Sequence, residues 1–181
     1  MKTIIVAGCT RSGMTMMMNV LYTGGYPCLG HPPGFEDYYQ PGMSYEQLKG
    51  YAVKVVDTHN WFPPKGDYLV IRMDRNKDEQ AKSIMKFIKH VLRLPIQRSQ
   101  KAKVKASLLD DLKKIDQWAS KQTKCITVSF ESLILNPKQT IGKISNEIGF
   151  RLSEKAIKAI IPRGTKCYNG MLEIKLIEDA E

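Results

Sequence analysis

Four short apolar runs along the chain predict the strands of a buried sheet. They are rich in β-branched residues and cover residues 3–8, 52–56, 68–71 and 125–128. Continuous apolar runs of this length are typical of strands that are covered on both faces, as in a parallel sheet.

Between these runs, apolar residues recur with the spacing of amphipathic helices. The periodicity predicts helices over residues 14–22, 77–94, 104–119, 137–148 and 153–161, and Ser44 with Gln47 predicts the cap of a further short helix. The helix over 77–94 is amphipathic: one face carries Ile84, Phe87, Ile88, Val91 and Leu92, and another carries Lys82, Lys86, Lys89 and Arg93. Pro95 would end that helix.

Strands that alternate with helices predict an α/β fold with right-handed crossovers. We therefore expect a three-layer α/β/α arrangement around a central parallel sheet. The 181 residues show no internal repeat and no linker, so residues 1–181 are expected to form one domain. Ligands of such sheets bind at the carboxyl ends of the strands.

The charge of the chain is strongly positive and unevenly distributed. The formal net charge is +10, and between Lys82 and Lys105 there are eight Lys or Arg residues and no Asp or Glu. Such a segment favours an anionic partner, which would be a nucleotide, a polyanion or nucleic acid. For most of these lysines, a solvated helix face is the better explanation.

Composition excludes several other classes of protein. Hydrophobic residues make up 43% of the chain, as in a globular protein, and no apolar run approaches the roughly 20 residues of a membrane span. The N-terminal apolar run is too short for a secretory signal. Four cysteines lie far apart without a C-x-x-C pair, which argues against zinc and predicts reduced thiols in a cytoplasmic protein.

Residues 7–15, AGCTRSGMT, follow the first apolar run and are similar to a phosphate-binding loop. Gly8, Gly13 and Thr15 fit the pattern G-x-x-x-x-G-K-[ST], whereas Met14 takes the place of the lysine. The amides that begin the next helix would bind one terminal phosphate, with side-chain donors from Arg11 and Thr15. Without that lysine, ATP chemistry is disfavoured. The alternative is that these residues form a simple glycine turn before a core helix.

Two other strand ends carry polar groups. Arg75 follows the third strand and Ser83 lies on the next helix, so the two would suit a second phosphate. His59 follows the second strand, where it would serve as a general base near neutral pH. Positions two apart on a strand share a face, so Asp57 is expected near His59. Taken alone, Arg75 and Ser83 are better explained as an exposed arginine and an ordinary helix serine. At the position of His59, a hydrogen-bonded loop histidine is as common as a general base.

Together, these segments resemble the motifs of the sulfotransferase family, which transfers a sulfuryl group from 3′-phosphoadenosine 5′-phosphosulfate (PAPS). Residues 11–15 resemble the 5′-phosphosulfate loop P-K-S-G-T-T, with Arg11 in the lysine position, and residues 56–59 resemble the K-T-H segment. Residues 75–83 resemble the 3′-phosphate motif R-N-x-K-D-x-x-x-S, and residues 130–137 resemble Y-E-D-L…x-P. Arg163 and Gly164 resemble a late R-K-G element. The chain is similar to a small member of this family, with a sulfotransferase-like variant of the P-loop NTPase fold.

The resemblance implies a role for each matching residue. Arg11 would stabilise charge on the bridging oxygen of the leaving group, and His59 would remove the proton of an acceptor hydroxyl or amine. PAPS would be the sulfuryl donor, and no metal is implied. The residues implied to bind it are Arg11, Ser12, Gly13, Met14, Thr15, Arg75, Ser83 and Phe130.

Three departures from the family pattern leave alternatives open. Asp57 replaces the lysine of K-T-H, Phe130 replaces a tyrosine, and the chain is shorter than typical cytosolic members.

The expected acceptor is a small molecule or a glycan, and it can be anionic; nucleic acid is not expected as an acceptor. The alternatives are a P-loop nucleotide or small-molecule kinase, which Met14 disfavours, and a non-catalytic relative that binds 3′-phosphoadenosine 5′-phosphate (PAP) or nucleic acid, which Asp57 favours.

Overall fold

The computed structural model describes residues 1–32, 34–35, 42–160 and 165–166, and its centre is a parallel sheet. The strands are β1 (Thr3–Gly8), β2 (Ala52–Val56), β3 (Tyr68–Asp74) and β4 (Lys124–Ser129), in the spatial order β2-β1-β3-β4. All three pairings are parallel. The four predicted strands are confirmed, and β3 extends beyond its predicted end at Ile71.

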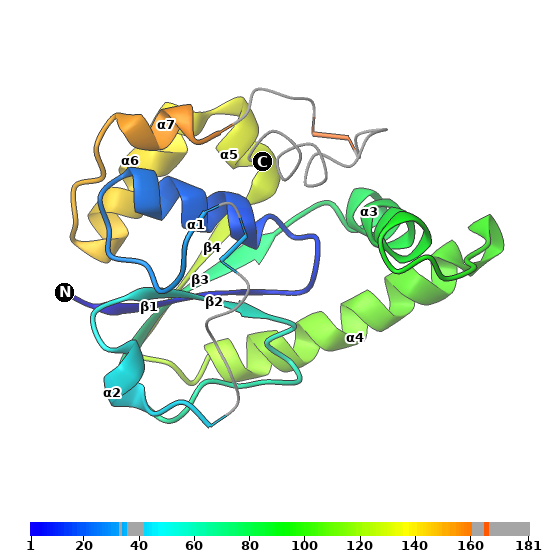
Figure 1. Cartoon of the computed structure of the whole chain (residues 1–181), viewed down its shortest axis with the longest axis horizontal. Coiled ribbons are helices and arrows are strands. Elements are labelled where there is room, and N and C mark those ends of the chain that lie inside the picture. The colour runs from blue at the N-terminus through cyan, green and yellow to red at the C-terminus, as the bar shows by residue number, and fades with distance from the viewer. Residues whose placement is uncertain (33, 36–41, 161–164, 167–181) are drawn as a thin grey trace.

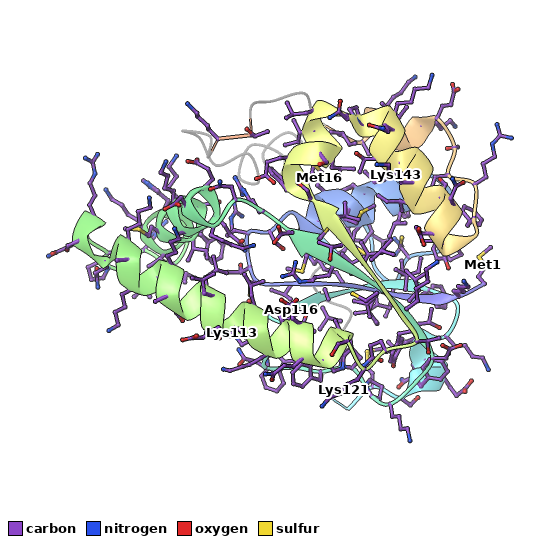
Figure 2. The ribbon with its side chains drawn as sticks, turned by 180° about the vertical axis from the view of Figure 1, so that it is seen from behind. Met1, Met16, Lys113, Asp116, Lys121 and Lys143 are labelled. Atoms are coloured by element: carbon purple, nitrogen blue, oxygen red, sulfur yellow. The ribbon has the colours of Figure 1, made fainter. Side chains whose placement is uncertain are left out.

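Helices cover both faces of this sheet (Figure 1). Ile4 and Val6 of β1 belong to a core with α1 (Met14–Thr23), α6 (Pro137–Ile148) and α7 (Lys155–Lys158). Ile5 and Ala7 alternate with them and belong to a second core with α2 (Tyr45–Leu48) and the end of α4 (Lys101–Ala119). Figure 2 shows the molecule from behind. Lys113 and Asp116 of α4, and Lys121 just after it, lie on one side of the sheet, and Met16 and Lys143 lie on the other. The predicted three-layer α/β/α fold is confirmed.

The end of β1 lies at the point where the order of the strands reverses. The chain passes from β1 to β2 on one side of it, and then crosses to β3 on the other side. Ligands of open α/β sheets bind at such a reversal, outside the carboxyl ends of the strands. The loop at residues 9–13 occupies this position, between β1 and α1.

The helices depart from their predicted bounds at several places. The helix α3 spans Lys77–His90 and ends before the predicted Leu94, so Val91 and Leu92 are 41% and 49% exposed. Its buried residues are Gln80, Ala81 and Ser83, whereas Ile84, Phe87 and Ile88 of the predicted apolar face are half-buried. Gln80 and Ser83 contact the loop after β1, and Ile84 packs against a small core that contains Cys9 and Leu112.

Caps explain most other helix boundaries. The predicted capping box of Ser44 and Gln47 is present at α2. A helix that was not predicted, α5 (Phe130–Leu135), begins where Ser129 Oγ accepts a hydrogen bond from the Ser132 amide. A 3₁₀ turn, η1 (Arg98–Gln100), precedes α4, which therefore starts earlier than predicted. Of the predicted helix over 153–161, α7 is the helical part, and residue 161 lies outside the described residues.

Within the described ranges, no helix has the length and apolar character that crossing a membrane requires. Three of the cysteines, Cys9, Cys28 and Cys125, are free thiols. Cys167 lies outside the described residues.

The N-cap of α3 allows a matched test of capping. Asn76 Oδ1 accepts hydrogen bonds from the amides of Asp78 and Glu79, whereas Asn136, the N-cap of α6, makes no side-chain capping bond. Asn76→Ala should therefore lower the free energy of unfolding by about 1 kcal/mol, as is usual for a lost N-cap. Asn136→Ala, measured by the same urea titration, should change it by much less. Equal losses would show that the Asn76 side chain does not cap α3.

Candidate active site at the end of β1

The loop between β1 and α1 is a tight turn with two residues in the left-handed region. Arg11 has a φ of 65° and Gly13 a φ of 101°, and the Ser12 amide donates to the Cys9 carbonyl oxygen at 3.2 Å. Gly13 is the N-cap of α1, so the first amides of that helix lie at the carboxyl edge of the sheet. Ser12 is buried, and within the described part of the chain its Oγ makes no hydrogen bond. Buried hydroxyls are usually bonded, so this one is available to a ligand that enters the loop.

Gly13, Phe130 and Arg75 form a stack beneath the loop. A Cβ atom at Gly13 would lie 2.6 Å from Cδ2 of Phe130, so close that the ring or the loop would have to move. The Arg75 guanidinium carbon lies 4.3 Å from the centroid of the same ring, which is a cation–π contact. Because Phe130 is only 2% exposed, its ring supports the loop and the arginine in this structure. The contact with adenine that the sequence implies for Phe130 stays a prediction.

The segment 75–83 bonds directly to the loop. Arg75 Nη1 donates to the Arg11 carbonyl oxygen at 3.0 Å, and Gln80 Nε2 donates to the Thr10 carbonyl oxygen at 3.0 Å. Arg11 Nε in turn donates to Ser83 Oγ at 3.0 Å, with its guanidinium carbon 5.7 Å from the Phe87 ring centroid. The structure therefore brings together Arg11, Arg75 and Ser83, which the sequence places in two separate phosphate motifs.

The end of β2 bonds to the loop from the other side. Thr58 Oγ1 accepts from the Gly8 amide at 3.3 Å and donates to the Val55 carbonyl oxygen at 2.8 Å. Asp57 Oδ1 accepts from the Thr10 amide at 3.0 Å. Asp57, at the position of the family's lysine, thus serves as a hydrogen-bond acceptor for the loop backbone.

The carboxylate that contacts His59 is Asp111 of α4. His59 Nε2 lies 3.5 Å from Asp111 Oδ1, and His59 Nδ1 is buried without a hydrogen bond to any described residue. The expected pairing with Asp57 rested on strand geometry, but β2 ends at Val56 and Asp57 has a φ of 50°. The alternation of a strand therefore does not extend to these positions.

Cys9, the first residue of the loop, is a buried thiol with a raised pKa. Its side chain is 3% exposed, and burial, with the nearby carboxylates of Asp111 and Asp57, raises the pKa of the thiol to about 12. A thiol with that pKa stays protonated at neutral pH, and the thiolate is the reactive form. The chemistry of the site therefore falls to the other loop residues.

Lys54 is a part of the site that the sequence analysis missed. It lies in the middle of β2, is 4% exposed, and its Nζ donates to Thr15 Oγ1 at 3.2 Å and to the Gly34 carbonyl oxygen. A lysine inside the apolar run 52–56 was the available signal, because a charged residue on a buried strand needs a polar partner. Met14, at the position of the P-loop lysine, is buried and apolar.

Comparison with solved structures identifies the fold. The "Sulfotransferase Domain from the Curacin Biosynthetic Pathway" matches with a TM-score of 0.60 over 90% of this chain and 78% of that chain, at 10% sequence identity. No protein-family model and no curated protein matches the sequence. The chain therefore has the fold of a sulfotransferase domain, as the sequence predicted. Arg163 and Gly164, the proposed late element, lie outside the described residues.

Gly13 provides a test of the stack beneath the loop. Gly13→Ala should lower the free energy of unfolding for two reasons. A non-glycine residue in the left-handed region costs about 1–2 kcal/mol, and overpacking against Phe130 costs roughly 1–3 kcal/mol more. Gly50 has a φ of 82° and open space around it, so Gly50→Ala reports the backbone cost alone. Urea unfolding should show the larger loss for Gly13→Ala, and Phe130→Leu should shrink the difference. The same loss at both glycines would contradict the stack.

Proposed function

We propose that the protein is a sulfotransferase that transfers a sulfuryl group from PAPS to a hydroxyl or amine of an acceptor. The observation that carries the proposal is the pair of hydrogen bonds between the two phosphate motifs, from Arg11 to Ser83 and from Arg75 to the Arg11 carbonyl. These bonds hold the two groups of residues that are proposed to bind phosphates side by side, at the reversal point of a sulfotransferase fold. A nucleotide with phosphates on both its 3′ and 5′ oxygens suits two such groups.

Each group of residues would bind one end of the nucleotide. The amides after Gly13, with the hydroxyls of Ser12 and Thr15, would hold the 5′-phosphosulfate. Arg75 and Ser83 would hold the 3′-phosphate. The Ser83 hydroxyl accepts from Arg11 and keeps its own proton, so it can donate that proton to a phosphate oxygen. Met14 would contribute its backbone amide to the loop.

In the reaction, an acceptor oxygen or nitrogen would form a bond to sulfur while the bond from sulfur to the phosphate oxygen breaks. Arg11 would stabilise the negative charge that develops on that oxygen. His59 would take the acceptor's proton, and Asp111 would stabilise the imidazolium that results. Since Nε2 faces Asp111 and Nδ1 is buried, the imidazole must turn toward an acceptor before it can act. The proposed acceptor is a small molecule or a glycan, which the positive charge of the chain allows to be anionic.

A second candidate is a protein that binds PAP without turnover. It is favoured by the orientation of His59, whose buried Nδ1 offers no base to a ligand in this conformation. The kinase alternative is less well supported, because the loop lysine is replaced by the buried Met14. Turnover measurements separate the two candidates.

Ligand binding tests the donor assignment. PAP should raise the melting temperature much more than AMP does, because only PAP carries the 3′-phosphate. Ser83→Ala removes one charge-assisted hydrogen bond, worth roughly 1.5–3 kcal/mol, and should weaken PAP about tenfold or more while it leaves AMP nearly unchanged. Ser107→Ala, at an exposed position of α4, is the matched control. If AMP stabilises the wild type as well as PAP does, or ATP with Mg²⁺ replaces both, the donor assignment is wrong.

Variants of His59 test whether the protein is a catalyst. His59→Asn should lower sulfuryl transfer by about 10²- to 10⁴-fold, the usual cost of a lost general base, with PAP affinity near normal. The assay follows PAP release from PAPS with a panel of phenols, alcohols, sugars and amines. His90→Asn, at the exposed end of α3, should leave turnover unchanged. Loss of PAP binding together with activity would make His59 a structural residue, and a wild type without turnover on any acceptor would favour the binding protein.

A further inference from the structure

The position of Lys54 follows from the register of the sheet. Lys54 pairs with Val6 of β1, and parallel neighbours in register point to the same face. Val6 faces α1, and so Lys54 extends beneath the first turn of that helix. There its Nζ meets the hydroxyl of Thr15, the last residue of the phosphate loop. The contact joins β2 to the part of the site where the 5′-phosphate is proposed to bind.

The ammonium of Lys54 is held in place inside the protein. Lys54 is 4% exposed, and its Nζ donates to the Thr15 hydroxyl and to the Gly34 carbonyl oxygen. The amino end of α1 carries partial positive charge beside it. An anion bound at the loop would be attracted by both the helix terminus and the ammonium.

Thr15 takes the place at which P-loop proteins coordinate magnesium. In the pattern G-x-x-x-x-G-K-[ST], the final hydroxyl binds Mg²⁺ and the lysine before it reaches the phosphates. In this chain the Thr15 hydroxyl accepts a hydrogen bond from an ammonium group, and Met14 fills the lysine position. The hydroxyl keeps its own proton, so it can donate to a phosphate oxygen while Lys54 polarises it.

We propose that Lys54 is the fixed cation of the 5′-phosphate site. It supplies from β2 the positive charge that other P-loop proteins obtain from the loop lysine and from magnesium, and it acts through the Thr15 hydroxyl. The inference rests on the proposed function, since it assigns a residue to the 5′ end of the PAPS site. It also makes donor binding independent of divalent cations.

The test separates the two ends of the nucleotide. Lys54→Met removes the charge and keeps an unbranched side chain that is one atom shorter, and calorimetry should show PAP bound about tenfold or more weakly. Adenosine 3′-phosphate lacks the 5′-phosphate, so its affinity should stay unchanged. Lys54→Arg should retain part of the PAP affinity. Lys124→Met removes a lysine at the opposite, amino end of β4 and should bind both ligands as the wild type does.

The outcomes distinguish this inference from the proposed function. If the wild type does not bind PAP, the proposed function fails. If the wild type binds PAP and folded Lys54→Met binds it equally well, or loses both ligands alike, Lys54 is not the cation of the 5′ site. Should Lys54→Met fail to fold, Lys54→Gln replaces it, because it removes the charge while it keeps a polar group near Thr15, and it should weaken PAP but not adenosine 3′-phosphate. PAP affinity that rises in Mg²⁺ relative to EDTA would also overturn the proposal.

Discussion

The backbone of the loop after β1 is partly buried among neighbouring elements, which provide hydrogen-bond partners for its polar groups. Within residues 8–11, the Gly8 amide bonds to Thr58, the Thr10 amide to Asp57, the Thr10 carbonyl to Gln80 and the Arg11 carbonyl to Arg75. A buried backbone group without a partner costs about as much as a lost hydrogen bond. The loop can therefore keep its shape only while the end of β2 and the start of α3 remain beside it.

This requirement accounts for the unusual burial of polar residues around the loop. Gln80 and Ser83 occupy the inner face of α3, where a helix of an α/β protein normally carries apolar side chains. Arg75 lies against Phe130 for the same reason, since its guanidinium reaches the loop carbonyl from the end of β3. Stability and ligand binding thus depend on the same side chains, and a substitution in this group would affect both.

The fold was predictable because its strands are continuous apolar runs, such as residues 3–8, and because glycine marks the turn after the first of them. The meeting of the motifs was predictable too, since the carboxyl ends of parallel strands share one edge. The contacts within the site were not. Nothing in the local sequence shows that Asp57 leaves the strand geometry, that His59 meets Asp111, or that Lys54 reaches Thr15. These depend on tertiary packing between distant segments.

Cys9 gives the loop a chemical property of its own. Its thiol is buried beneath α4, next to Leu108, Leu112 and Ile115, and its raised pKa keeps it in the unreactive form. An alkylating reagent can reach it only when α4 or the loop moves away, and only then does the thiol ionise readily. The rate at which Cys9 is alkylated therefore measures how often this part of the fold opens, and a ligand that closes the loop would slow it.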